Sequence, residues 1–267
     1  MPADGVIAIG WGELALATLF MLVTGALSLA IGLGLVKDLA IGTVRTYLQL
    51  LALGFVLRWV FETRLWWVVV LILGLMTVMA TRIVLRRAPD APPGLFGSSF
   101  VAMAFTGITV TFAVTALVVR VPVWYEPRYV IPIAGMVLGN SMTGIALALE
   151  RLFSDLESRS GEVLSLAALG ASTWEAARDS VRSALRAGLI PTINSMAAAG
   201  IVFIPGMMTG QILAGADPLE ATKYQIVVML MVSAATAIGS IMAVMLAYRR
   251  RFTAEGVYLS SGDRSAS

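Results

Sequence analysis

The sequence predicts an all-α, polytopic integral membrane protein, a helical bundle of about seven transmembrane helices with a cytoplasmic helical elbow. Two observations lead to this fold class. Hydrophobic residues make up 58% of the 267 residues and charged residues only 13%, whereas about 25% of a soluble domain is charged. The apolar residues also gather in runs of about 20, each long enough to cross roughly 30 Å of hydrocarbon as a helix. Lipid is therefore the predicted solvent of most of this chain.

Seven predicted spans follow one another along the chain. They cover residues 14–36, 41–61, 65–85, 100–119, 129–149, 189–214 and 224–248. The segment before the first span contains Asp4 and lacks the basic stretch that opens a signal peptide, so the first span is expected to stay uncleaved. Residues 253–267 are rich in serine, glycine and charge, which predicts a disordered cytoplasmic tail. The predicted transmembrane domain is therefore 1–252.

The basic residues predict the orientation of these spans. With the N-terminus outside and the C-terminus inside, the cytoplasmic segments hold Lys37, Arg45, Arg82, Arg86, Arg87, Arg151, Arg159, Arg178, Arg182, Arg186, Arg249, Arg250, Arg251 and Arg264. The external segments hold Arg58, Arg64, Arg120, Arg128 and Lys223. This bias is the one that the positive-inside rule describes. The sequence therefore predicts an N-out, C-in, multi-pass protein of the cell (inner or plasma) membrane.

The composition argues against several classes of function. The chain has neither cysteine nor histidine, so thiol catalysis, the usual general base and the commonest metal ligands are missing. It contains no P-loop pattern, so it is not expected to bind ATP itself. Its net charge of +3 is modest and the basic residues are scattered, which gives nucleic-acid binding no support. We predict no catalytic residues and no cofactor bound by this chain. A membrane-embedded enzyme acting on lipid-linked substrates would need paired carboxylates, histidine or a metal-ligand cluster at the membrane surface. The acidic residues in the loop after the fifth span have instead the spacing of a solvated helix face.

The segment 150–188 is cytoplasmic in this orientation and predicts two helices joined by a tight turn. Ser172 and Glu175 form a capping box, so a helix should begin after Ser172. Gly170 is placed to end the preceding helix, 163–169, in a left-handed conformation. The second helix carries apolar residues on one face (Trp174, Ala177, Val181 and Leu185) and arginines on another (Arg178, Arg182 and Arg186). Such a hairpin either lies on anionic lipid headgroups or docks a soluble partner, and the pattern favours neither.

This elbow leads at residues 188–191 directly into the sixth span, which is broken near its middle. Pro205 lacks an amide hydrogen and frees backbone carbonyls, and Gly206 follows it. Breaks of this kind are tolerated where they line a cavity or pack on protein. Met207 and Met208 add thioether sulfurs, which bind soft cations but suit hard ferric iron poorly. A proline kink with two packing methionines is the alternative, and no metal ligand is assigned.

Polar or helix-breaking residues inside the spans are candidates for a translocation path. They are Arg45, Gln49, Asn140, Ser141, Asn194, Pro205, Gly206, Met207, Met208 and Gln211. Amides and hydroxyls at such positions also join helices to one another, and Arg45 lies close enough to the cytoplasmic end of its span to snorkel. No Asp or Glu lies well inside any span, which disfavours a proton- or sodium-coupled mechanism.

Several segments carry a resemblance to a known family. Residues 167–172 (AALGAS), followed further along by Ile190 and Pro191, resemble the cytoplasmic coupling segment of ABC-transporter permeases. Longer segments are similar to the FetB-type permeases of the UPF0014 family: 131–140 (IPIAGMVLGN), 189–195 (LIPTINS), 204–210 (IPGMMTG) and 214–218 (AGADP). That family includes bacterial iron-export permeases and plant aluminium-tolerance membrane proteins.

The resemblance implies the permease subunit of an ABC transporter. Such a subunit is expected as a homodimer in membrane lipid, paired with a cytoplasmic ATPase that binds the ATP, and exporting a metal ion such as iron by alternating access. The coupling residues that it implies are Leu169, Gly170, Ala171, Ser172, Trp174, Arg178 and Arg182. A stand-alone carrier or channel without an ATPase partner is the alternative.

Overall fold

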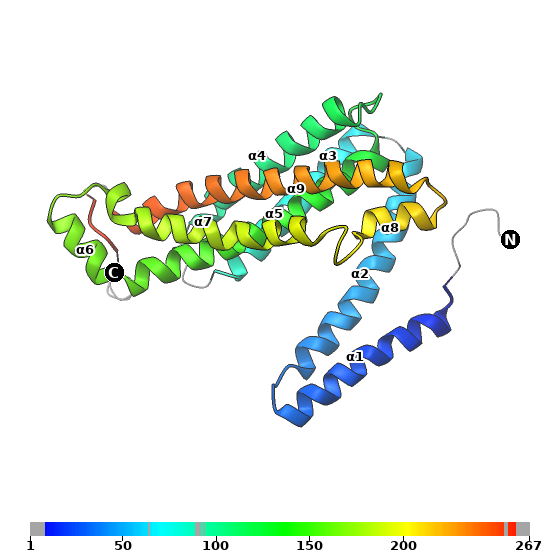
Figure 1. The fold of residues 1–267 in the computed structure, drawn as a ribbon, viewed down its shortest axis with the longest axis horizontal. Coiled ribbons are helices and arrows are strands. Elements are labelled where there is room, and N and C mark those ends of the chain that lie inside the picture. Colours follow the sequence, from blue (N-terminus) through cyan, green and yellow to red (C-terminus); the bar gives the residue numbers. More distant parts are fainter. Residues whose placement is uncertain (1–8, 64, 89–91, 93, 254–255, 260–267) are drawn as a thin grey trace.

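The computed structural model describes residues 9–63, 65–88, 92, 94–253 and 256–259. Helices make up most of this part of the chain, and most of them run along one long axis (Figure 1). They are α1 (Trp11–Ile31), α2 (Val36–Thr63), α3 (Trp66–Arg86), α4 (Leu95–Ala113), α5 (Pro127–Ser158), α6 (Ser160–Ala168), α7 (Thr173–Ala198), α8 (Gly206–Leu213) and α9 (Pro218–Ala247). A π-helical turn (Val114–Val118) continues α4, and a 3₁₀ turn (Tyr248–Arg251) follows α9.

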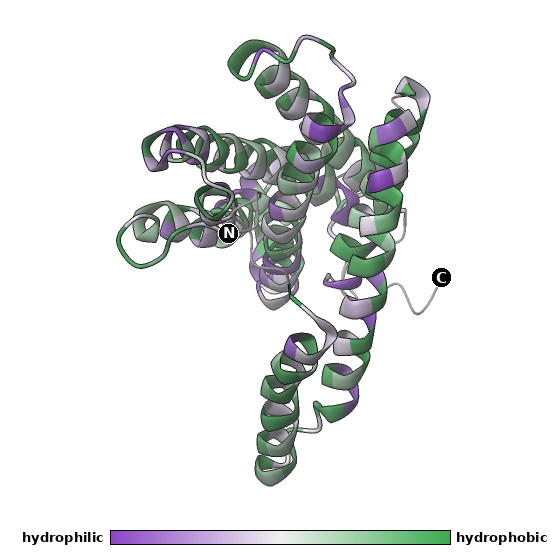
Figure 2. Cartoon of the chain, turned by 90° about the vertical axis from the view of Figure 1, so that its right-hand side faces the viewer, coloured by the Kyte–Doolittle hydropathy of each residue, from purple (hydrophilic) through white to green (hydrophobic). Residues whose placement is uncertain are grey.

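Six of these helices are long and apolar enough to cross a membrane: α1, α2, α3, α4 with its π-helical turn, α5, and α9 with its 3₁₀ turn. Hydrophobic residues run along the helices throughout, interrupted by isolated hydrophilic bands (Figure 2). This confirms the predicted fold class, an all-α polytopic membrane protein.

The central helix of the bundle is α5, which packs against α3, α4, α7 and α9. Its buried side extends along almost the whole helix, from Val130 to Leu156. Leu149, Leu152 and Phe153 are fully buried in the main core cluster together with residues of α3, α4, α7 and α9. Because α5 packs against both α7 and α9, any movement of either helix must be accommodated at its surface.

The predicted sixth span, 189–214, is broken near its middle as expected, and the structure shows where its two helices begin and end. The first part of the span belongs to α7, which runs without a break through Gly188 and Pro191. Pro191 removes only one backbone hydrogen bond, and the packing of α7 along α5 and α9 accommodates it. The second part begins at α8, with Pro205 as the N-cap residue. Pro205 therefore starts a helix and does not kink one, because a missing amide hydrogen costs nothing at a helix start.

The break between α7 and α8 has its own local structure. Gly200 adopts a φ of +80°, which a residue without Cβ reaches at little cost. Its amide donates to the carbonyl of Phe203 at 2.9 Å, and Ala199 pairs with Phe203 in an isolated bridge. Ile201 and Val202 point outward and are exposed. The break is thus an ordered loop with apolar side chains on the outside, as expected for a segment surrounded by lipid.

The predicted tail, 253–267, falls mostly outside the described residues. Its described part folds back onto the chain, because Tyr258 pairs with Phe252 across an isolated bridge and is buried. The two rings meet edge to face, 5.6 Å apart. This part of the tail packs against α5, where the hydroxyl of Tyr258 donates to the Glu157 carboxylate at 3.5 Å.

Candidate functional site

The two ends of the bundle differ in charge and in structure. The end that carries α6, here called the hairpin end, also holds the ends of α3, α5 and α9 with their arginines; the opposite end holds α8 (Figure 1). The arginines near the ends of α3, α5 and α9, which the sequence places on one side of the membrane, therefore lie at one end of the bundle. Three features of the bundle could serve transport: the helical hairpin, a polar cavity and the break before α8.

The hairpin is formed by α6 and the first turns of α7. Gly170 has a φ of +86°, its amide donates to the carbonyl of Ala167, and the amide of Ala171 donates to that of Leu166. These two bonds form a Schellman motif, which satisfies the last carbonyls of α6. The predicted glycine C-cap is thus observed. At the tip, Leu169 is 84% exposed, an unusual position for a leucine outside lipid.

The start of α7 is held by the predicted capping box. The Oγ of Ser172 accepts a hydrogen bond from the amide of Glu175 at 3.3 Å, and the amide of Ser172 donates to the Glu175 carboxylate at 2.8 Å. The hydroxyl and amide of Ser172 hold the pKa of Glu175 below its ordinary value, because both stabilise the charged carboxylate. The tip is therefore a defined shape and not a flexible loop.

The hairpin contacts the bundle through its apolar face. Ala177 and Val181 are fully buried, and the Trp174 ring meets the Tyr248 ring edge to face at 5.9 Å while remaining 40% exposed. On the opposite face, Arg178 and Arg182 are exposed and lie within 4.0 Å of Asp179. Next to this face is a basic groove of about 820 Å³, lined by Arg151, Asp179, Arg182, Ser183, Leu185, Arg186, Ala187 and Ile190. The predicted division of α7 into two faces is observed.

A polar cavity of about 240 Å³ lies where α5, α7 and α9 meet. Its lining is Asn140, Thr143, Gly144, Leu147, Gly188, Pro191, Thr192, Ser195, Met229, Val232 and Ser233. Asn140, Thr143 and Ser195 are exposed, so the cavity opens on the surface of this single chain. An open polar cavity at membrane depth is costly in lipid and is typical of a path or an interface.

The cavity exists because α5 and α7 approach each other closely beside it. A Cβ atom on Gly188 would lie 2.6 Å from the carbonyl oxygen of Gly144. Two glycines thus allow the backbones to touch, and Pro191 follows within a turn of the contact. The hydroxyls of Thr192 and Ser195 line the cavity just beyond this contact.

The break before α8 borders a second cavity, near the α8 end. It has a volume of about 420 Å³ and is lined by Val114, Val119, Arg128, Tyr129, Pro132, Ile133, Met136, Met207, Gln211, Tyr224, Val227, Val228 and Met231. The Oε1 atom of Gln211 is buried and has no hydrogen-bond partner among the described residues. Met208 points elsewhere: its sulfur accepts a hydrogen bond from Thr222 at 3.9 Å.

The structure separates the predicted path residues into groups. Asn140 lines the polar cavity, whereas Met207 and Gln211 line the cavity at the α8 end. Ser141 is fully buried beside Asn140 but faces into the bundle, and its hydroxyl has no partner among the described residues. Pro205 and Gly206 form the start of α8, and Asn194 is exposed outside both cavities. Arg45 and Gln49 lie on α2, away from the bundle.

Sequence reasoning missed Thr192, Ser233 and the contact between Gly144 and Gly188. A hydroxyl in a helix is common, and nothing in the sequence shows that two glycines from different helices face each other. Only the crossing of α5 and α7 gives these residues a shared cavity.

No compact metal centre is present in the part of the chain that the structure describes. The described residues contain no group of three or more histidine, cysteine, aspartate or glutamate side chains that could hold a metal ion.

These features define a multi-pass helical membrane protein with a polar cavity at membrane depth, the architecture of a membrane transporter. The chain belongs to the family described as "Uncharacterised protein family (UPF0014)", which it matches over residues 11–252. The resemblance found in the sequence is thereby confirmed.

Relatives of this chain are known from bacteria and plants. It is 37% identical to the UPF0014 membrane protein slr1647 of Synechocystis, over 83% of this chain and 85% of that protein. It is 34% identical to the probable iron export permease protein FetB of Escherichia coli, over 89% of this chain and 90% of that protein. It is also 34% identical to the protein ALUMINUM SENSITIVE 3 of Arabidopsis thaliana, over 90% and 86%. No solved structure matches this chain.

Proposed function

We propose that this chain is the membrane-spanning permease subunit of an ABC transporter and that it exports a metal ion such as iron. One observation carries the proposal: a single continuous helix, α7, leads from the exposed hairpin tip to the polar cavity. A helix of 26 residues spans about 39 Å. A push on the tip can therefore reach Thr192 and Ser195 without passing through a flexible joint.

In this mechanism, two cytoplasmic ATPase subunits bind the ATP and close on each other. Their closure displaces the tip around Gly170 and Ala171, which fits a groove on the ATPase. The displacement tilts α7 about its contact with α5, at Gly144 and Gly188. The polar cavity then opens toward the other side of the membrane, as alternating access requires.

Two copies of the permease are expected. The polar cavity is open on the surface of one chain, so a second chain is needed to enclose a translocation path. The name of the FetB relative supports export and iron. The exposed leucine at the hairpin tip supports a protein partner, since it lies beside a turn of defined shape.

The experiment that tests this proposal is co-purification of the chain with its candidate ATP-binding subunit. Ala171→Asp places a charge at the tip without touching a membrane span. Ala216→Asp makes the same change in the exposed turn between α8 and α9, at the opposite end, and serves as the matched control. An unpaired charge buried in an interface costs about 2–5 kcal/mol, so the retained ATPase should fall by about tenfold or more in Ala171→Asp.

Either result is informative. Loss of the ATPase in Ala171→Asp alone, with normal membrane insertion, supports coupling through the tip. If the unaltered chain binds no ATPase and still moves metal ions in liposomes, the permease assignment is wrong and the stand-alone carrier takes its place.

A further inference from the structure

Arg45 and Gln49 form a polar patch on α2 that is not covered by the rest of the chain. They lie one helical turn apart, so they share a face, and both are exposed. Neither has a hydrogen bond or ion pair among the described residues. Gln49 is thirteen residues into α2, about 20 Å along the helix axis. At that depth an amide in lipid lacks partners, and an uncompensated arginine nearby costs several kcal/mol.

The architecture keeps this patch away from the chain's own polar cavity. The pair of helices α1 and α2 diverges from the bundle (Figure 1), and the only buried residue of α2 is Val60, near α3. The loop between α1 and α2 therefore lies far from α5 and α7. Something other than this chain's bundle must cover Arg45 and Gln49.

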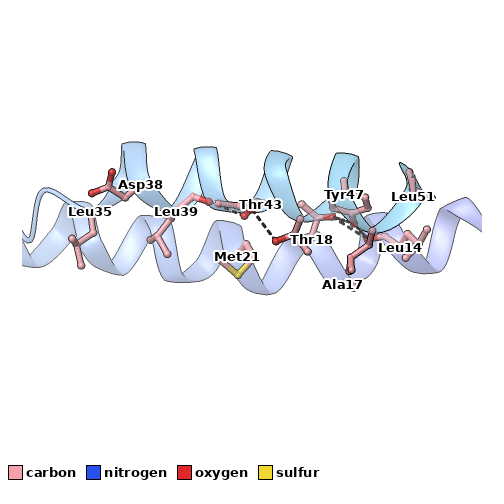
Figure 3. A pocket seen from close by; sticks show the side chains of 13 residues that line it. Leu14, Ala17, Thr18, Met21, Leu35, Asp38, Leu39, Thr43, Tyr47 and Leu51 are labelled. Carbon is pink, nitrogen blue, oxygen red and sulfur yellow. Dashed lines mark hydrogen bonds between the residues drawn. The ribbon is translucent and has the colours of Figure 1, made fainter. Parts of the chain in front are cut away.

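The other face of α2 is already occupied by α1. A groove of about 600 Å³ between the two helices is lined mostly by apolar residues, together with Thr18, Asp38, Thr43, Thr46 and Tyr47 (Figure 3). The hydroxyls of Thr18 and Tyr47 lie 2.7 Å apart, and Tyr47 donates to the carbonyl of Leu14 at 2.8 Å. Because Thr43 and Tyr47 face α1, Arg45 and Gln49 face outward on the opposite side. The helices α1 and α2 thus form a preformed pair, and the polar patch lies on the outer face of α2.

The polar cavity of the bundle offers the groups that this patch lacks. The Nδ2 of Asn140 donates to the carbonyl of Met136 at 2.8 Å, and its Oδ1 remains available as an acceptor. Thr143 and Ser195 add exposed hydroxyls. The depths also agree: Gln49 is eight residues from the near end of its predicted span and Asn140 nine from the same end of its own, about 12 and 14 Å.

We propose that α2 of a second copy of this chain lies against the open α5–α7 face, so that Arg45 and Gln49 of that copy complete the polar cavity around Asn140, Thr143 and Ser195. Donors from α2 then meet acceptors on α5 and α7, and neither surface is left in lipid. In a two-fold dimer each copy gives and receives the same contact. This inference rests on the proposed function, because it assigns the second half of the transport path.

Disulfide cross-linking between differently tagged copies tests the arrangement. The chain contains no cysteine, so every thiol is an introduced one. Gln49→Cys in one copy is paired with Asn140→Cys, Thr143→Cys or Ser195→Cys in the other, and the membranes are oxidised. Gln49→Cys paired with Ile108→Cys is the matched control, since Ile108 is an exposed residue of α4 at similar depth. A double variant at Ala199 and Phe203, which pair across a bridge, shows by loss of thiol labelling that the oxidant reaches the membrane.

The expected result is a cross-linked heterodimer for at least one of the three pairs, about tenfold or more above the control, because a disulfide needs Cα atoms within about 7 Å. Three results would overturn the proposal. In the first, the cross-linked product of all three pairs stays at the control level although the Ala199–Phe203 variant oxidises. In the second, Gln49→Cys of one copy links to Gln49→Cys of the other in preference to α5 or α7. In the third, Gln49→Cys and Thr143→Cys link within one chain. None of these concerns binding of an ATPase, so the proposed function is judged separately by co-purification.

Discussion

Gly188 of α7 faces Gly144 of α5 with no space between them, since a Cβ atom on Gly188 would lie 2.6 Å from the Gly144 carbonyl oxygen and 2.9 Å from the Cβ of Ala148. The side chains of Thr236 and Ser240 on α9 close the contact from the other side. Three helices therefore meet at one point next to the polar cavity. A backbone contact of this kind sets both the crossing and the possible tilt of α7.

Gly188→Ala should destabilise the bundle by about 1–3 kcal/mol, because the added methyl group has no room and forces the helices apart. The expected observation is a lower midpoint of thermal unfolding in detergent. Gly139→Ala is the matched control: it is a helical glycine of α5 with nothing within 4 Å of the added Cβ. Because alanine has a higher helix propensity than glycine, this variant should be as stable as the unaltered protein or slightly more stable. Equal stability of the two variants would show that α5 and α7 have room for a methyl group at their crossing.

Asn140→Leu should lower transport about tenfold, because it removes amide groups from the polar cavity while keeping side-chain volume, at a cost of about 1–1.5 kcal/mol. Asn194→Leu makes the same change on an exposed site outside both cavities and should alter transport by less than about twofold. Initial rates in liposomes, normalised to inserted protein, give the comparison. A stronger effect at Asn194 would indicate that the translocation path lies on the other face of α7.

Arg251 fastens the C-terminal segment to α5. It is 1% exposed, its Nη1 donates to the Glu157 carboxylate and to the carbonyl of Leu259 at 3.3 Å, and its guanidinium lies 5.4 Å from the Phe153 ring centre. Arg251→Leu should cost about 1–3 kcal/mol, less than a fully buried pair because Glu157 keeps one third of its side chain exposed.

The measurement for this contact is hydrogen exchange over the chain following Arg251, which should quicken. Arg250→Leu, at the neighbouring exposed position, is expected to leave exchange unchanged. Fast exchange in the unaltered protein would mean that the ion pair does not hold the segment.

The hairpin tip should loosen in acid. Because the pKa of Glu175 is lowered by its hydrogen bonds from Ser172, the carboxylate contributes stability that is fully present above the ordinary glutamate pKa. That contribution is lost as the pH falls through the lowered value. Exchange of the first amides of α7 should therefore quicken below the ordinary pKa of glutamate. In Glu175→Ala this pH dependence should disappear, and an unchanged dependence would assign it to another group.

Local signals in the sequence predicted most of the helices. Apolar runs located the spans, the Ser172–Glu175 pattern placed the start of α7, and Gly170 placed the end of α6, because each of these depends on neighbours along the chain. The same reasoning predicted a sixth span that is broken near its middle, and the structure shows this break between α7 and α8. It left open whether Pro205 kinks a helix, because whether a proline starts a helix or lies within one depends on what packs around it.

The sequence by itself therefore determined the membrane environment, the all-helical class, the capped hairpin and the family, all of which are written in composition or in short segments. Only the tertiary structure brought Asn140, Thr192 and Ser233 to one cavity and set Gly144 against Gly188. It also turned Arg45 and Gln49 away from the bundle that contains the other polar residues. These relationships join residues far apart in the chain, and they arise from the packing of whole helices, which no local pattern encodes.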